Sequence, residues 1–168
     1  GVQTCALPIC GAGIQADLKT MTMLGCFGMS AITALTAQNT TGVREICPVP
    51  AAFLEQQIAA VCEDIPPLAV KIGMVYDIPQ IHAIAAAVRK YRLPHVVVDP
   101  VMVATSGDAL LRSQAQTALT QELFPLAEVI TPNLPEARQL TGMEITSPAE
   151  MEQAAGTLAE RYRTAVLL

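Results

Sequence analysis

The chain has 168 residues, of which 52% are hydrophobic and 15% are charged, which is typical of a single compact domain and excludes a disordered chain. Its formal net charge of −5 and its lack of tryptophan argue against nucleic-acid binding, because a polyanion is repelled and stacking platforms are scarce. The uncharged residues 20–43 contain three glycines and several hydroxyl side chains. They therefore predict a helix end and a buried strand rather than a membrane span.

The cysteines indicate a reducing compartment. None of the five forms a Cys-x-x-Cys pair, and Cys26, Cys47 and Cys62 stand among apolar residues. We therefore expect buried free thiols rather than a disulfide framework. The start of the chain also lacks a basic segment followed by an apolar one, so no secretory signal is visible. Together these features predict a cytoplasmic protein.

The two ends of the chain differ from the rest. Residues 1–10 show neither helical nor alternating periodicity, and they back-translate to a common sequencing-library adapter. We interpret residues 1–10 as a non-native segment and residues 11–168 as the N-terminal part of one domain. The apolar run from Thr164 to Leu168 follows a helix, which is typical of a buried strand. We therefore expect a domain that is truncated at both ends.

Hydrophobic periodicity and capping residues predict alternating helices and strands. The expected helices span residues 11–24, 51–65, 78–91 and 113–126, and two more begin near residues 134 and 148. The expected strands span residues 29–37, 43–49, 68–72, 95–98, 129–131 and 164–168. Asp77 is a predicted N-cap, while Asn133 with Glu136, and Ser147 with Glu150, match the capping box.

Apolar strands that alternate with helices of about ten to fifteen residues indicate a parallel sheet covered on both faces. We therefore predict an α/β fold, with three α/β/α layers around a mainly parallel sheet. Ligands of such sheets bind beyond the carboxyl ends of the strands. The candidate segments that follow strands are residues 38–40, 73–74, 99–102 and 132–136.

Five segments carry a family resemblance. In chain order they read GAGIQADLKT from residue 11, TALTAQNT from residue 33, KIGM from residue 71, VDPVM from residue 98 and ITPNLPEA from residue 130. They closely resemble the hydroxymethylpyrimidine/phosphomethylpyrimidine kinases, a family of the ribokinase-like superfamily. The resemblance implies a ribokinase-like kinase domain over residues 11–168. It also implies ATP- and Mg²⁺-dependent phosphorylation of 4-amino-5-hydroxymethyl-2-methylpyrimidine, and then of its monophosphate, for thiamine diphosphate synthesis.

The resemblance assigns four residues to the pyrimidine. Gln38 matches the side chain that reads the aminopyrimidine, because an amide both donates and accepts; a polar residue at a strand end is the alternative. Met74 and Val101 match positions that flank the ring, although either could be ordinary core. Asp17 matches a position near the pocket, and the alternative is a solvated charge on a helix.

The resemblance assigns three further residues to ATP and Mg²⁺. Asp99 and Glu136 are expected to bind the metal, through water, and Asn133 is expected to face the phosphates. Asp99 could instead cap a loop, and a capping box alone explains Asn133 and Glu136. Both interpretations of the last pair are compatible, because a helix N-terminus is itself an anion site. Residues 105–108 resemble a flexible loop near the pocket.

The family continues into a Lys-Gly-Gly segment and a Gly-Thr-Gly-Cys anion hole, which this sequence lacks. We therefore expect the catalytic residues beyond Leu168, none of them within the chain, and no appreciable kinase activity from the 168 residues alone. A pyridoxal kinase and a non-catalytic pyrimidine-binding module are the rival interpretations, and residues 37–40 favour the pyrimidine enzyme. The resemblance also suggests that the longer protein is a homodimer, with no membrane or nucleic-acid partner.

Overall fold

The computed structural model describes residues 13–39, 42–102 and 113–168. Its centre is a parallel four-stranded sheet in which the strands neighbour one another in chain order. The strands are β3 (Val70–Ile72), β4 (Val96–Val98), β5 (Val129–Ile130) and β6 (Ala165–Val166). The helices are α1 (Gly13–Met23), α2 (Ala51–Asp64), α3 (Ile78–Tyr91), α4 (Ser113–Ala118), α5 (Leu134–Thr141) and α6 (Pro148–Tyr162).

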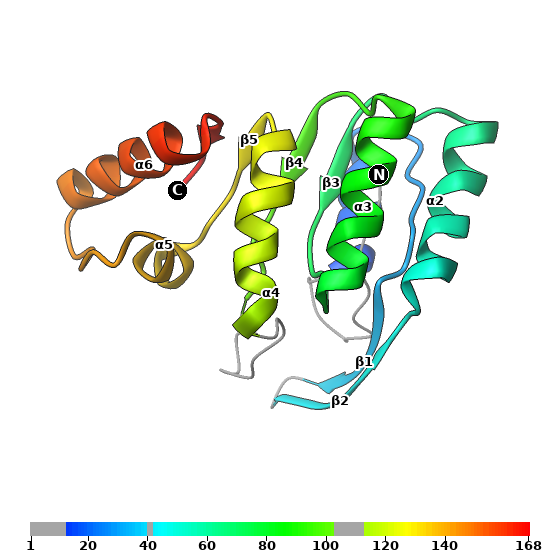
Figure 1. Ribbon diagram of the computed structural model, residues 1–168, viewed down its shortest axis with the longest axis horizontal. Coiled ribbons are helices and arrows are strands. Elements are labelled where there is room, and N and C mark those ends of the chain that lie inside the picture. Colours follow the sequence, from blue (N-terminus) through cyan, green and yellow to red (C-terminus); the bar gives the residue numbers. More distant parts are fainter. Residues whose placement is uncertain (1–12, 40–41, 103–112) are drawn as a thin grey trace.

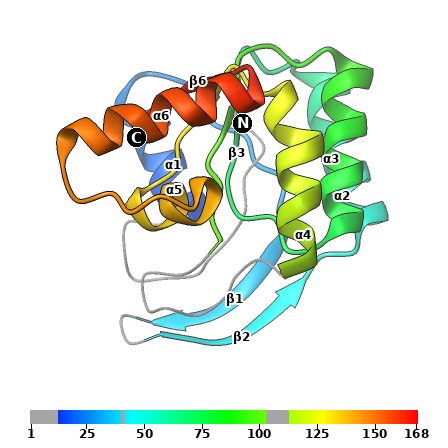
Figure 2. The same ribbon diagram turned by 60° about the vertical axis from the view of Figure 1, so that its left-hand side comes forward.

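Helices cover both faces of this sheet. Helices α2, α3 and α4 lie side by side over one face, and α1 lies on the opposite side of β3 (Figures 1 and 2). Helices α5 and α6 pack together and connect β5 to β6. The predicted three-layer α/β fold with a mainly parallel sheet is therefore confirmed.

The two faces of β3 differ in a way that matters for the site. Val70 and Ile72 are buried in the main hydrophobic core, where they meet apolar side chains of α2 and α3 such as Ile58 and Ile84. Successive side chains of a strand point to opposite faces, so Lys71 points away from that core, toward α1. Lys71 is thus the one residue of the three-residue strand β3 that lies outside the main core.

The strand predicted at residues 29–37 begins later than expected and does not join the parallel sheet. Strands β1 (Ala34–Asn39) and β2 (Gly42–Pro48) pair antiparallel in a sheet of their own. The chain between them is too short for the crossover that parallel strands need, so a hairpin is the only pairing available. The hairpin extends beyond the end of the main sheet at which α3 and α4 begin (Figures 1 and 2).

The last predicted strand, residues 164–168, is shorter than expected and is not buried throughout. Only Ala165 and Val166 pair with β5, which is itself two residues long and therefore offers a short ladder. The Leu167 N–H still donates to the Ile130 carbonyl at 3.0 Å, but the Leu167 side chain is exposed. Leu168 lies outside the strand, and its partly buried side chain packs against the main core. The apolar run at residues 164–168 thus predicted that a strand forms here, but not that it ends at Val166.

The predicted helix at residues 113–126 is not uniform. After α4, Leu119–Leu123 forms a π-helical turn and Phe124–Leu126 a 3₁₀ turn. Pro125 has no N–H to continue the α-helical ladder, so a different hydrogen-bond pattern closes the helix.

The prediction of buried cysteines holds for Cys62 alone. Cys26 lies in the segment after α1, and Cys47 lies on β2 opposite the exposed Leu35; both thiols are exposed. An apolar neighbourhood in sequence did not imply burial here, because one face of the hairpin is open to solvent. Burial raises the pKa of the Cys62 thiol, so this thiol stays protonated at neutral pH. Among the described residues, no helix is both long and apolar enough to cross a bilayer.

All three predicted N-caps are confirmed. Asp77 accepts a hydrogen bond from the backbone of Gln80. Asn133 and Ser147 each form a complete capping box, with Glu136 and Glu150 respectively. These caps satisfy backbone N–H groups that would otherwise have no partner at the start of each helix.

The capping box of α6 makes stability depend on pH. Four hydrogen bonds from the backbone and hydroxyl groups of Thr146 and Ser147 reach Glu150, and they lower its pKa from 4.5 to about 2. A lowered folded-state pKa stabilises the fold above the unfolded value, and this contribution is lost as pH falls from 4.5 toward 2. We expect Glu150→Gln to lower the Tm at neutral pH, by a margin that narrows on acidification. Thermal unfolding followed by circular dichroism at several pH values measures the difference in Tm between the variant and the wild type. An equal effect of Glu152→Gln would contradict the capping explanation.

Candidate functional site

The carboxyl edge of the sheet gathers most of the predicted site residues. Met74 follows β3, Asp99 and Val101 follow β4, and Asn133 follows β5 at the start of α5. The hairpin lies at the same end (Figure 1). Parallel strands bring their carboxyl ends to one edge, which explains how residues far apart in the sequence meet here.

Three charged side chains form what we call the Lys71 cluster: Asp17, Lys71 and Asp99. The Lys71 ammonium lies 3.0 Å from Asp17 Oδ1 and 3.3 Å from Asp99 Oδ2. Asp17 comes from α1, Lys71 from β3, and Asp99 from the first position after β4. Asp17 is thus ion-paired rather than a lone solvated charge, and its side chain is only 17% exposed.

The cluster has more negative than positive charge. Burial raises the pKa of Asp99, and repulsion from Asp17 adds to this while Lys71 opposes it. Burial also raises the pKa of Glu136, to which repulsion from Asp99 contributes. Within the part of the chain that the structure describes, Asp17 Oδ2 is buried and has no hydrogen-bond partner. Among residues 13–39, 42–102 and 113–168, three carboxylates therefore interact in this region with one ammonium group, that of Lys71, and this arrangement favours a further cation.

Glu136 is buried and belongs to the capping box of α5. Its side chain is 4% exposed, and Glu136 Oε2 accepts from the Asn133 N–H at 2.9 Å while Asn133 Oδ1 accepts from the Glu136 N–H at 2.9 Å. A hydrogen bond from the backbone of Met102 also lowers its pKa. Glu136 therefore ties the start of α5 to the segment after β4.

An apolar group lies where the hairpin meets the sheet, and we call it the Met74 cluster: Ala34, Met74, Val43, Ile46, Tyr76 and Val101. It joins two of the residues predicted to flank the pyrimidine, Met74 and Val101. Gln38 is the cross-strand partner of Val43, which places it beside this cluster. Gln38 lies within β1 rather than after a strand of the main sheet, so the hairpin brings it to the site.

The donor set is compatible with Mg²⁺ in a particular way. Among the described residues, no group of three or more histidine, cysteine or acidic side chains is arranged to hold a metal directly. Mg²⁺ commonly keeps several waters and uses one or two carboxylates together with substrate phosphates. Asp99, with Glu136 behind it, suits that mode of binding. Residues 105–108, predicted to form a nearby loop, lie outside the described residues.

Lys71 is the site residue that sequence reasoning missed, although the segment KIGM contains it. A lysine between two apolar residues of a short strand is a usable signal, because lysine is seldom buried without a partner. The identity of its partners was not readable from sequence, since Asp17 lies 54 positions before it.

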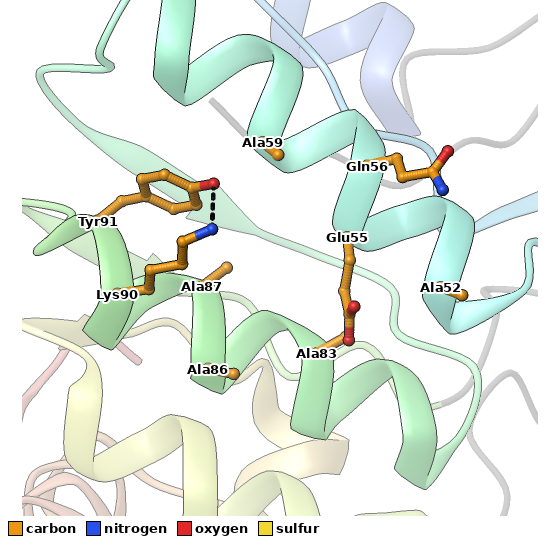
Figure 3. A pocket seen from close by; sticks show the side chains of 9 residues that line it. All are labelled: Ala52, Glu55, Gln56, Ala59, Ala83, Ala86, Ala87, Lys90 and Tyr91. Atoms are coloured by element: carbon orange, nitrogen blue, oxygen red, sulfur yellow. Dashed lines mark hydrogen bonds between the residues drawn. The ribbon is translucent and has the colours of Figure 1, made fainter.

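A surface groove of about 480 Å³ lies between α2 and α3, away from these residues (Figure 3). Alanines of both helices line its floor, and Lys90 donates a 2.9 Å hydrogen bond to the Tyr91 hydroxyl at one end. None of the predicted site residues lines it. The candidate site is therefore the carboxyl edge rather than this groove.

Comparison with known proteins identifies the family of the chain. The family model described as "Phosphomethylpyrimidine kinase" matches residues 8–168. The chain belongs to the phosphomethylpyrimidine kinase family. It is 49% identical to the hydroxymethylpyrimidine/phosphomethylpyrimidine kinase of Bacillus subtilis, with 89% of this chain and 55% of that protein covered. It is 52% identical to the Rhizobium meliloti protein of the same name, with 94% and 59% covered. The chain thus spans somewhat more than half the length of these relatives.

Solved structures confirm the ribokinase-like fold expected for this family. The crystal structure of phosphomethylpyrimidine kinase from Clostridium difficile has a TM-score of 0.85 at 44% identity, covering 98% of this chain and 72% of that chain. Pyridoxal kinase from Staphylococcus aureus, in complex with AMP-PCP and pyridoxal, has a TM-score of 0.83 at 32% identity, covering 98% and 59%. The two kinds of kinase share this scaffold, so the scaffold alone does not choose the substrate.

Proposed function

We propose that the protein containing this chain phosphorylates 4-amino-5-hydroxymethyl-2-methylpyrimidine and then its monophosphate, using ATP and Mg²⁺, in thiamine diphosphate synthesis. The observation that carries the proposal is the meeting of an apolar cluster and a charged cluster at one edge of the sheet, in a chain of this family. The apolar cluster provides the contacts that a flat heterocycle needs. The charged cluster provides carboxylates for the Mg²⁺ that accompanies a phosphoryl group.

The Met74 cluster is suited to an aminopyrimidine. Met74 and Val101 supply apolar contacts to the ring, while the Gln38 amide pairs with the exocyclic amine and a ring nitrogen. Asp17 contributes a carboxylate on the side of α1. Pockets of this kind combine a mostly apolar lining with a few polar groups that orient the ligand.

The Lys71 cluster is suited to the phosphates. Asp99 and Glu136 hold Mg²⁺ through water, and Asn133 presents the N-terminus of α5 to the phosphates of ATP. When bound, Mg²⁺ neutralises charge on the transferred phosphoryl group. The Staphylococcus aureus complex with AMP-PCP and pyridoxal supports the use of ATP on this scaffold.

A pyridoxal kinase is the second candidate, because that structure is closely similar over nearly the whole chain. Residues 37–40 and the higher identity to the pyrimidine kinase favour the first candidate. A non-catalytic pyrimidine-binding module would use the same Met74 cluster without turnover. The cytoplasmic location and the homodimeric state of the longer protein stay predictions.

Replacing Gln38 tests the substrate assignment. We expect the 168-residue chain to bind the hydroxymethylpyrimidine more tightly than pyridoxal, and Gln38→Leu to weaken pyrimidine binding by roughly 10- to 100-fold, since it leaves ring polar groups unpaired. Isothermal titration calorimetry measures both. Gln56→Leu, at an exposed position of α2, is the matched control and should bind as the wild type does.

The placement of the catalytic residues beyond Leu168 stays a prediction and is part of this proposal. The residues before Leu168 then bind the pyrimidine, the metal and the phosphates, and the anion hole of a longer protein stabilises the transferred phosphoryl group. Turnover of the pyrimidine by the 168-residue chain itself would show that this division is wrong.

Turnover is therefore measured in a protein of the relatives' full length that contains these residues. ATP-dependent formation of the pyrimidine monophosphate and diphosphate supports the proposal. Pyrimidine binding without any turnover would instead support the non-catalytic binding module. Faster turnover of pyridoxal than of the pyrimidine would support the pyridoxal kinase.

A further inference from the structure

The side chain of Gln80 on α3 is buried and fully hydrogen-bonded. It is 1% exposed. Gln80 Nε2 donates to the Thr33 carbonyl at 2.8 Å and to the Val49 carbonyl at 2.7 Å, and Gln80 Oε1 accepts from the Tyr76 N–H at 3.0 Å. Both N–H groups and the oxygen of its side-chain amide are thus used, which satisfies the hydrogen-bonding capacity that a buried amide must meet.

The three partners have one feature in common: they hold the hairpin to the site. Thr33 immediately precedes β1 and Val49 immediately follows β2, so they are the two roots of the hairpin. Tyr76 lies in the segment that follows Met74, and the Thr33 hydroxyl donates to the Met74 carbonyl at 2.8 Å. One side chain therefore joins both roots to the segment that carries Met74.

The position of Gln38 is sensitive to these roots. The hairpin pairs with no strand of the main sheet among the described residues, so its direction is set by its roots and by the packing of Val43 and Ile46 in the Met74 cluster. Gln38 lies five positions after Thr33, a distance of roughly 16 Å along an extended chain, so a rotation of about 10° at the roots would move Gln38 by roughly 3 Å. Displacements of this size are larger than a bound ligand tolerates.

We propose that Gln80 is a positioning residue that sets the direction of the β1–β2 hairpin and thereby the separation of Gln38 from Met74. Gln80 acts through these two residues and does not itself contact the substrate. The inference rests on the proposed function, because it assigns the pyrimidine to the space between them. It predicts that a buried amide remote from the reacting atoms controls substrate affinity and turnover.

The test uses Gln80→Met, which keeps the size of the side chain and removes its hydrogen bonds. We expect pyrimidine binding to the chain to weaken about tenfold, and backbone amides of β1 and β2 to exchange faster with deuterium. In a protein of the relatives' length, kcat should fall by up to about 10²-fold. The double variant Gln80→Met with Gln38→Leu should bind no more weakly than Gln38→Leu alone, because the two residues act on one contact.

Two further variants keep the test decisive. Thr164→Val removes another buried hydrogen bond, from the Thr164 hydroxyl to the Ala127 carbonyl at 2.8 Å, far along the chain from the hairpin. It should lower the Tm without changing pyrimidine affinity. If Gln80→Met fails to fold, Gln80→Asn keeps a neutral amide on a shorter side chain that no longer reaches all three partners. Its pyrimidine affinity should be lower than that of the wild-type chain, and an unchanged affinity would overturn the positioning role.

The outcomes separate this inference from the proposed function. Wild-type affinity in Gln80→Met, or additive losses in the double variant, would overturn the positioning role even if the pyrimidine is the substrate. If the wild-type chain binds no pyrimidine, the proposed function fails. Deuterium exchange then still decides whether Gln80 fixes the hairpin: faster exchange confined to β1 and β2 supports it, and unchanged exchange overturns it.

Discussion

Replacing Lys71 with methionine is expected to lower kcat/KM by about 10²- to 10³-fold, as measured by the rate of ATP-dependent pyrimidine phosphorylation in a protein of the relatives' length. Lys71 lies within 3.0 Å of Asp17 and 3.3 Å of Asp99. Without its charge the two carboxylates repel each other across the site, and the pKa of Asp99 rises further because Lys71 currently lowers it. Both the pyrimidine side and the phosphate side of the site then lose their fixed geometry.

The same substitution has a second signature. Removing one positive charge from a region with three carboxylates makes it more negative, so Mg²⁺ titrated into the isolated chain should bind more tightly to Lys71→Met than to the wild type. Loss of turnover with a gain in cation affinity distinguishes a charge bridge from simple unfolding. Lys71→Arg should retain much of the activity, and Lys90→Met in the groove between α2 and α3 should be silent. Wild-type kinetics in Lys71→Met would remove Lys71 from the site.

Truncating Phe124 is expected to cause the largest loss of stability, about 3–5 kcal/mol in the free energy of unfolding. Its side chain is fully buried, and its ring meets that of Tyr162 edge-on, with centroids 4.8 Å apart at 87°. Phe124→Ala therefore leaves a cavity where the end of the α4 segment meets α6, and removes an aromatic contact as well. Urea unfolding followed by circular dichroism measures the change.

Phe53 on α2 is the matched control because it is the same residue type and 57% exposed. Phe53→Ala should change the free energy of unfolding by less than about 1 kcal/mol, as surface substitutions usually do. Equal losses for the two variants would mean that burial does not explain the cost of Phe124→Ala.

Local signals in the sequence were sufficient for the helix starts. Asp77, Asn133 and Ser147 each accept a hydrogen bond from a backbone N–H three residues on, as their spacing predicted. Such caps involve neighbours in the chain, so their formation depends little on distant contacts. The same locality explains why the predicted helix of residues 51–65 ends within a residue of α2.

The candidate site was partly readable for a related reason. Met74, Asp99 and Asn133 follow buried strands, and a parallel sheet brings such positions together whatever the remaining sequence. Their neighbours were less accessible. The sequence around Asp17 does not indicate that Lys71 is its partner. Likewise, the Met102 backbone that donates a hydrogen bond to Glu136 lies 34 positions before it.

The sequence by itself determined the alternation of elements, the helix caps, the parallel core and the family, because periodicity, capping and motif spacing are properties of short stretches of chain. The tertiary structure alone decided that the β1–β2 hairpin does not join the main sheet, that Cys26 and Cys47 are exposed, and that Lys71 joins Asp17 to Asp99. It also decided that Gln80 holds the hairpin at both roots. These features depend on pairs of groups that are distant in the chain or on which face of an element meets solvent, and only the packing of the whole chain sets them.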